Sequence, residues 1–290
     1  MSRIFDEILK ARRLDDPRKR AEFLSPDYTK RHNPFLLPDM EKAVERLVEA
    51  RKAQERITIY GDYDIDGLTA TTVLLDALES FGFEHVEAFI PNRFREGYGL
   101  TVDAVERIAG TGAQLIITVD CGSLSTKEIE RAQELSVDVI VTDHHNVQKV
   151  QPPAVAVINP KRLLQEYPEM YENYILKSPL SSSQISSKSA RRSLDTGPVA
   201  ESAPSFEKSS AILSKVGAAP RAVTRLSKSD SSQSRHSELD SESMSELYPF
   251  LDLPGVGVAF KLVQALQTRL DGLPKGQEKW LLDLVALGTV

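Results

Sequence analysis

The sequence is poor in several features, and each scarcity narrows the class of protein. Its single cysteine, Cys121, cannot form a disulfide within the chain, which suits a reducing compartment. No run approaches the ~20 apolar residues that cross a bilayer. The first residues, Met1-Ser2-Arg3-Ile4, are too polar for a signal peptide. We therefore expect a cytoplasmic protein without a membrane partner.

Positive charge is outnumbered by negative charge. Lys and Arg together number 36 against 42 Asp and Glu, which gives a formal net charge of −6. Phosphate contacts need Lys and Arg, so this balance excludes a chain that binds nucleic acid over its whole surface. Any DNA binding must come from a local patch, from bound metal ions or from sequence outside this chain.

What is present is an alternation of helical and strand patterns. Apolar residues recur at helical spacing in four segments, and short apolar runs lie between them. The expected helices are residues 39–55, 68–81, 102–109 and 126–135, and the expected strands are residues 57–60, 86–90, 115–119, 137–141 and 154–158. This alternation predicts an α/β fold with a doubly wound, mostly parallel sheet.

Acidic residues and histidines stand directly after three of these strands. Because the carboxyl ends of parallel strands meet at one edge of the sheet, we expect these side chains to lie together. Two divalent cations need several anionic oxygens to hold them, and imidazole favours Mn²⁺ or Zn²⁺ over Ca²⁺. A lone Asp-x-Asp is more often a loop or a helix cap, but here that explanation would need three independent caps. The candidate ligands are Asp62, Asp64, Asp66, Asp120, Asp143 and His144, with His145 adjacent.

These residues carry a family resemblance. Asp62-Tyr63-Asp64-Ile65-Asp66-Gly67, Val119-Asp120-Cys121-Gly122 and Thr142-Asp143-His144-His145 resemble motifs I, II and III of the DHH phosphoesterase superfamily. Five further segments resemble its RecJ branch of single-strand-specific 5′→3′ DNA exonucleases. They are His32-Asn33-Pro34-Phe35-Leu36-Leu37, Ile90-Pro91-Asn92-Arg93-Phe94, Glu96-Gly97-Tyr98-Gly99-Leu100, Ala156-Val157-Ile158-Asn159-Pro160 and Gly255-Val256-Gly257-Val258-Ala259-Phe260-Lys261-Leu262.

The resemblance implies a role for each candidate residue. Two Mn²⁺ or Mg²⁺ ions would be held by Asp64, Asp66, Asp120 and His144, with Asp120 bridging them. Asp62 and Asp143 would complete or orient this ligand set, and His145 would contact the scissile phosphate. The implied activity is phosphodiester hydrolysis on single-stranded DNA in repair and recombination. A single-stranded-DNA-binding protein and a helicase are the implied protein partners.

Two other functions stay open. A phosphoesterase of the same superfamily that acts on oligonucleotides, cyclic dinucleotides or pyrophosphate would share the three motifs, but it should lack the glycine-rich helix that begins at Gly255. A non-catalytic remnant would usually have lost acidic ligands, and all those of motifs I to III are present here.

Three local features admit two interpretations each. In the loop 91–99, Arg93 could pair with a phosphate and Tyr98 could stack on a base, or the loop could simply be solvated; the resemblance favours the first. Gly67 could allow a phosphate to approach a helix N-terminus or could relieve a tight turn. Cys121 could be a ligand, but we expect a small side chain packed at a strand end.

The composition changes abruptly after residue 163. From residue 178 to 245 nearly a third of the residues are serine, and no helical or strand period survives. Residues 178–229 are basic and residues 230–246 are acidic, so the first part could bind DNA, but we favour a solvated tract that only keeps the insertion soluble. We expect a disordered insertion that lies between Asn159-Pro160 and Tyr248-Pro249-Phe250, which are close together in the RecJ branch.

The expected organisation has four parts. Residues 1–38 are an N-terminal extension, residues 39–163 a DHH domain, residues 164–247 the insertion, and residues 248–290 a helical continuation of the domain. Residues 284–290 resemble the start of motif IV, whose next residues in the family are Ala-Asp. We therefore expect an N-terminal fragment of the complete enzyme, with little exonuclease activity of its own.

Overall fold

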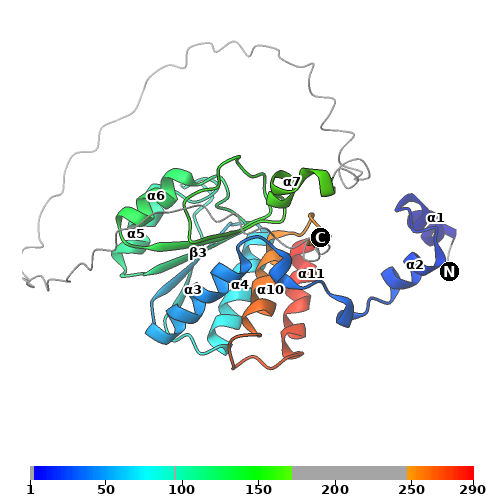
Figure 1. Ribbon diagram of the computed structural model, residues 1–290, viewed down its shortest axis with the longest axis horizontal. Helices are drawn as coiled ribbons and strands as arrows, with labels where there is room; N and C mark the ends of the chain where they lie inside the picture. The colour runs from blue at the N-terminus through cyan, green and yellow to red at the C-terminus, as the bar shows by residue number, and fades with distance from the viewer. Residues whose placement is uncertain (1–2, 95, 172–246) are drawn as a thin grey trace, which may run out of the picture.

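A five-stranded parallel sheet lies between two layers of helices (Figure 1). The computed structural model describes residues 3–94, 96–171 and 247–290. The strands are β1 (Ile57–Gly61), β2 (Val86–Phe89), β3 (Leu115–Val119), β4 (Asp138–Thr142) and β5 (Ala156–Ile158). The helices packed around the sheet are α3 (Met40–Ala53), α4 (Ile65–Ser80), α5 (Val102–Gly110), α6 (Thr126–Glu134), α10 (Gly255–Leu266) and α11 (Leu282–Thr289). The other helical elements are α1 (Arg3–Ala11), α2 (Pro17–Leu24), η1 (Tyr28–Lys30), η2 (Pro34–Leu36), α7 (Arg162–Glu166) and η5 (Gln277–Leu281).

The strand order creates a crevice at one point of the sheet. The order is β2-β1-β3-β4-β5, and every neighbouring pair is parallel. After β1 the chain continues to β2, toward one edge of the sheet, and after β3 it continues to β4, toward the opposite edge. Helix α4 therefore covers one face and α6 the other, so the loops after β1 and β3 diverge. Ligands of such sheets bind in the crevice outside the carboxyl ends of these strands.

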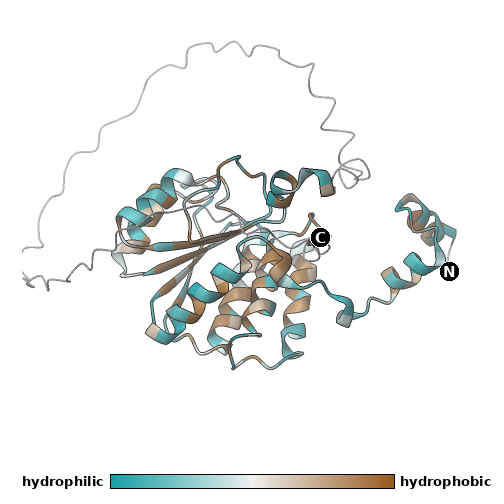
Figure 2. Ribbon diagram, in the orientation of Figure 1, coloured by the Kyte–Doolittle hydropathy of each residue, from teal (hydrophilic) through white to brown (hydrophobic). Residues whose placement is uncertain are grey.

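Successive side chains of each strand point to opposite faces of the sheet, so the hydrophobic core consists of two clusters. Ile59 and Ile117 pack into the larger cluster with α3, α4 and α10, whereas Tyr60 and Ile116 pack into the smaller cluster under α5 and α6. Figure 2 shows the hydrophobic strands between the helices; α3, α5 and α6 carry many hydrophilic residues, whereas α10 is mostly hydrophobic and is buried along its whole length. Among the described residues, none of the helices has the length and apolar character needed to cross a membrane.

The structure confirms the α/β fold and its doubly wound parallel sheet. One boundary in motif I is different, because α4 begins at Ile65 rather than near residue 68. Asp64 is the N-cap of this helix, and its Oδ1 accepts a hydrogen bond from the backbone N–H of Gly67 at 3.0 Å. Asp66 and Gly67 therefore lie in the first turn of the helix.

The segment that precedes α3 is part of the folded domain. The Tyr28 hydroxyl donates a hydrogen bond to the buried Glu278 carboxylate at 2.7 Å. The Lys261 ammonium, buried on α10, donates to the carbonyl of His32 at 2.8 Å. The expected extension 1–38 thus includes a stretch that closes over α10, while α1 and α2 reach away from the sheet (Figure 1).

The packed part of the chain continues beyond residue 163, where we expected the domain to be interrupted. Helix α7 runs through residue 163, and Leu164 and Tyr167 pack against the core. The Tyr171 hydroxyl donates to the carbonyl of Tyr248 at 2.7 Å, so the chain on the two sides of residues 172–246 meets. The disorder expected for the serine-rich stretch falls on residues outside the described part of the chain.

This meeting of the two flanks yields a prediction. Replacing residues 172–246 by a short Gly-Ser linker should leave the domain folded, because Tyr171 and Tyr248 are already in contact and loop closure depends only weakly on loop length. The urea midpoint of the shortened protein should match that of the wild type. Insolubility of the shortened protein, or loss of its cooperative unfolding, would contradict the prediction.

Candidate metal centre

Motif I forms a tight turn at the end of β1. Asp62 is buried, and its Oδ1 accepts a hydrogen bond from the backbone N–H of Tyr63 at 2.8 Å. Burial, followed by the charge of Asp64, raises the pKa of Asp62. A Cβ on Gly67 would lie 2.5 Å from the carbonyl oxygen of Asp62, so glycine is needed for this close approach. The tight-turn interpretation therefore accounts for Gly67.

Asp120 occupies a special position at the end of β3. Its backbone is left-handed, with φ of 60°, a conformation that Asp and Asn tolerate better than most residues. Its side chain is only 1% exposed. Burial raises the pKa of Asp120 to about 6, and the neighbouring carboxylate of Asp66 contributes to the rise. Asp120 Oδ1 is buried and accepts no well-formed hydrogen bond from the part of the chain that the structure describes.

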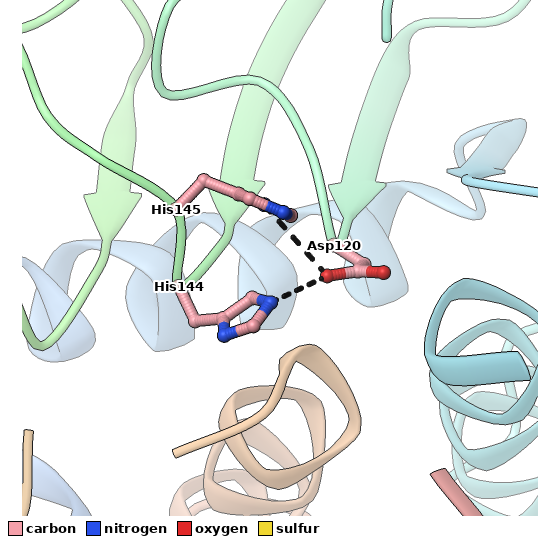
Figure 3. Close-up of side chains that lie close together, drawn as sticks. All are labelled: Asp120, His144 and His145. Atoms are coloured by element: carbon pink, nitrogen blue, oxygen red, sulfur yellow. Dashed lines mark ion pairs between the residues drawn. The ribbon is translucent and has the colours of Figure 1, made fainter. Parts of the chain in front are cut away.

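Two imidazoles from the loop after β4 face this oxygen (Figure 3). His144 Nε2 lies 3.0 Å from Asp120 Oδ1, but the angles are not those of a hydrogen bond. His145 Nδ1 lies 3.9 Å from the same oxygen. A buried carboxylate oxygen without a hydrogen bond, with two ring nitrogens beside it, is the arrangement that a bound cation would satisfy.

The Asp143 carboxylate stabilises the loop that carries these histidines. Its Oδ1 accepts hydrogen bonds from the N–H groups of His144 and His145 and from His145 Nδ1, and its Oδ2 accepts one from the N–H of Ser123. Burial alone would raise the pKa of Asp143, but these hydrogen bonds outweigh it and lower the pKa. The hydrogen bond that His145 Nδ1 donates to Asp143 also raises the pKa of His145. Asp143 thus orients His145.

Asp66 connects the centre to a helix distant in sequence. Its two carboxylate oxygens accept hydrogen bonds from the backbone N–H groups of Gly255 and Val256, each at 2.7 Å. These are N–H groups of the first turn of α10, where the helix dipole favours a negative charge. The same Asp66 carboxylate lies 3.6 Å from His144 Nε2. The N-terminus of α10 therefore fixes Asp66 at the edge of the centre.

Gly255 also touches Asp120. A Cβ placed on Gly255 would lie 2.6 Å from Asp120 Oδ1 and 2.7 Å from Asp120 Cβ, which is closer than real contacts allow. Helix α10 can thus approach the centre only with glycine at its first position. The sequence motif contained this glycine, but its partner is 135 residues earlier in the chain.

The potential ligand atoms form two groups that share one residue. Asp62, Asp64 and Asp120 make the first group, and Asp120, His144 and His145 make the second. Within each group the ligand atoms lie within 4.8 Å of one another. Among the described residues, these groups leave out Asp66, which is held by α10, and Asp143, which is held by its own loop. Carboxylate oxygens with imidazole nitrogens suit Mn²⁺ chemically.

Other predicted and unpredicted residues lie beside this centre. The Arg93 guanidinium stacks on the Tyr63 ring at 5.3 Å, and the Tyr98 hydroxyl lies 3.2 Å from the His145 ring nitrogens. Cys121 is packed in the smaller core cluster, as expected. The buried Asn159 was not predicted as a site residue, yet its Nδ2 donates to the carbonyl of His145 at 3.0 Å. Its position directly after β5 was the available signal.

Comparisons with known proteins find a matching family model and similar curated proteins. Residues 56–191 match the family model of the DHH family, N-terminal domain. The single-stranded-DNA-specific exonuclease RecJ of Bacillus subtilis is 39% identical over 161 residues, covering 56% of this chain and 20% of that protein. RecJ of Escherichia coli is 44% identical over 124 residues, covering 43% of this chain and 22% of that protein.

A solved structure extends the likeness to most of the chain. The crystal structure of exonuclease RecJ bound to manganese superposes with a TM-score of 0.51 and 26% identity, covering 87% of this chain and 43% of that one. The chain spans about a fifth of the length of the two curated relatives. The motifs, the fold and these matches together show that residues 56–191 form a DHH-type N-terminal domain similar to that of the RecJ exonucleases.

Proposed function

We propose that this chain carries the metal-binding part of a nuclease that hydrolyses single-stranded DNA from its 5′ end. The observation that carries the proposal is the position of Asp120 in both groups of ligand atoms. One carboxylate shared by two adjacent groups is what a pair of bridged cations requires. The Mn²⁺ in the related crystal structure and the names of the curated relatives support the choice of metal and of substrate.

The residues that would hold the ions are Asp62, Asp64, Asp120 and His144, with Asp66 at the edge of the set and Mn²⁺ or Mg²⁺ as the cations. Two such ions, when bound, polarise a phosphoryl oxygen and activate water for in-line attack. Asp66 would join them as a ligand by giving up a hydrogen bond to α10, or would position His144 from where it stands.

The remaining residues of the centre would handle the substrate. His145, oriented by Asp143 and by the Tyr98 hydroxyl, would donate a hydrogen bond to the scissile phosphate. Arg93 stands beside motif I and would pair with a neighbouring phosphate. Tyr98 would contact the nucleotide next to it. These contacts lie at one edge of the sheet, so a single strand could reach all of them.

The setting of the complete protein follows from the same proposal. A cytoplasmic enzyme in repair and recombination would act on strands that a helicase exposes and that a single-stranded-DNA-binding protein covers. Because this chain has an acidic net charge, most contacts with the phosphate backbone of the DNA would come from sequence outside this chain or from such partners.

The test compares three substrates in Mn²⁺: single-stranded DNA labelled at its 5′ end, pyrophosphate and a dinucleotide. We expect nucleotide release from DNA to be preferred, and to be abolished in Asp64→Ala and His144→Ala. The rate should be slow, because the relatives are about five times longer than the matched region. Faster turnover of pyrophosphate would assign the centre to small substrates instead. Absence of hydrolysis together with absence of Mn²⁺ binding would overturn the proposal.

A further inference from the structure

A cavity of about 360 Å³ opens beside the candidate metal centre, on the side of α5 and α6. It lies between the loops that follow β2, β3 and β4. Its volume is near the lower end of the range of ligand pockets, about 300–1,000 Å³, which suits one nucleoside rather than a longer segment. The residues that matter for its chemistry are Tyr98, Leu100, Leu124, Glu128, His145 and Asn146.

His145 connects this cavity to the centre. Its Nδ1 is 3.9 Å from Asp120 Oδ1, and its ring also lines the cavity. A phosphate held at His145 would therefore place one of its attached nucleosides at the cavity mouth. Leu124 is 60% exposed and Tyr98 is 55% exposed, so the rim offers apolar surface on which a flat base can lie.

Glu128 gives the cavity its charge. It is half-buried in the first turn of α6 and, within the part of the chain that the structure describes, its carboxylate has no hydrogen bond or ion pair. Together with Asp143, which also lines the cavity, it disfavours an anionic occupant. The occupant must therefore be the neutral part of a nucleotide rather than its phosphate.

A helix-capping role does not explain Glu128. Ser125 and Glu128 have the spacing of a capping box, in which each side chain would bond to the backbone N–H of the other residue. In the structure the N–H of Ser125 donates to the carbonyl of Gly122 at 3.0 Å, and the Ser125 side chain makes no capping bond. The Glu128 carboxylate is thus available to a ligand.

We propose that this cavity is a nucleoside subsite in which Glu128 accepts hydrogen bonds from the N–H groups of a base. The proposal rests on the proposed function. A carboxylate has two acceptor oxygens and matches the adjacent N1–H and N2–H donors of guanine. Thymine presents one N–H between two carbonyl oxygens, which a carboxylate repels. The subsite should therefore prefer guanine to thymine, with adenine and cytosine between them.

The test measures binding of the four 2′-deoxynucleosides to the metal-free chain by saturation-transfer NMR. Deoxyguanosine should bind at least about fivefold more tightly than thymidine, since a hydrogen bond to a charged group is stronger than a neutral one. Glu128→Gln, which puts a donor and an acceptor in place of two acceptors, should reduce this ratio to less than about twofold. Leu124→Ala should weaken the binding of all four nucleosides by a similar factor.

Glu130→Gln is the matched control, because Glu130 is exposed on the same helix and does not line the cavity. It should leave the ratio unchanged. An unchanged ratio in Glu128→Gln, or no binding of any nucleoside by the wild type, would overturn the subsite. Mn²⁺ binding, measured separately by calorimetry, needs no nucleoside. Failure of the subsite with Mn²⁺ binding intact would leave the proposed function standing.

Discussion

Asp120→Asn should weaken Mn²⁺ binding by more than about 100-fold, measured by calorimetry. Even residues that only support metal ligands change affinity by about 10- to 100-fold, and Asp120 belongs to both groups of ligand atoms. Asparagine is the right replacement because it tolerates the left-handed backbone at this position, whereas alanine would add strain. The matched control is Asp103→Asn, at an exposed aspartate in the first turn of α5.

The same variant should stabilise the metal-free protein at neutral pH. The pKa of Asp120 is about 6 in the folded state against 3.8 for the free side chain, so folding favours the protonated form. The folded state therefore loses stability as the pH rises from about 4 to about 6, by up to about 3 kcal/mol. Asp120→Asn removes this loss, so its Tm should exceed that of the wild type above pH 6.5 and match it below pH 4.

Wild-type affinity for Mn²⁺ in the Asp120→Asn variant would remove the basis of the two-metal proposal.

Gly255→Ala should damage both the fold and the centre. The added methyl group would lie 2.7 Å from Asp120 Cβ, and overpacking of this kind typically destabilises by about 1–3 kcal/mol. Relief of the clash must move either Asp120 or the first turn of α10, which holds Asp66. The urea midpoint should fall, and Mn²⁺ affinity should fall by about tenfold or more.

Gly110→Ala provides the control for that change. Gly110 is also helical, and a methyl group there would have no neighbour within 4 Å. This substitution should leave both measurements close to wild type. If Gly255→Ala behaved like Gly110→Ala, the close packing of α10 against Asp120 would not exist in solution.

The local patterns predicted the sheet because apolar periodicity is a local property. The runs at residues 57–60 and 115–119 became β1 and β3 with almost the expected bounds, and the acidic residues after them met at one edge. The start of α4 was missed, because the capping bond from Gly67 to Asp64 lies within the acidic motif, which was interpreted as ligands alone.

Contacts between distant segments could not be predicted in this way. Nothing near Asp66 in the sequence indicates that its carboxylate binds the first turn of α10. The packing of residues 28–37 against Lys261 is likewise not indicated by the local sequence, because the hydrogen bond from Lys261 to His32 joins residues 229 positions apart. The family resemblance indicated which residues belong to one centre, whereas their hydrogen-bond partners required the structure.

The bond between Asp66 and Gly255 has a consequence for the order of events during synthesis. These two residues are 189 positions apart. At a translation rate of about 5–20 residues per second, Asp66 is made roughly 10–40 s before Gly255. From the synthesis of His145 until that of Gly255, motifs I to III exist together in a nascent chain without the helix that holds Asp66 in place. A ribosome that stalls before residue 255 therefore carries every histidine and aspartate of the three motifs but an incompletely assembled centre.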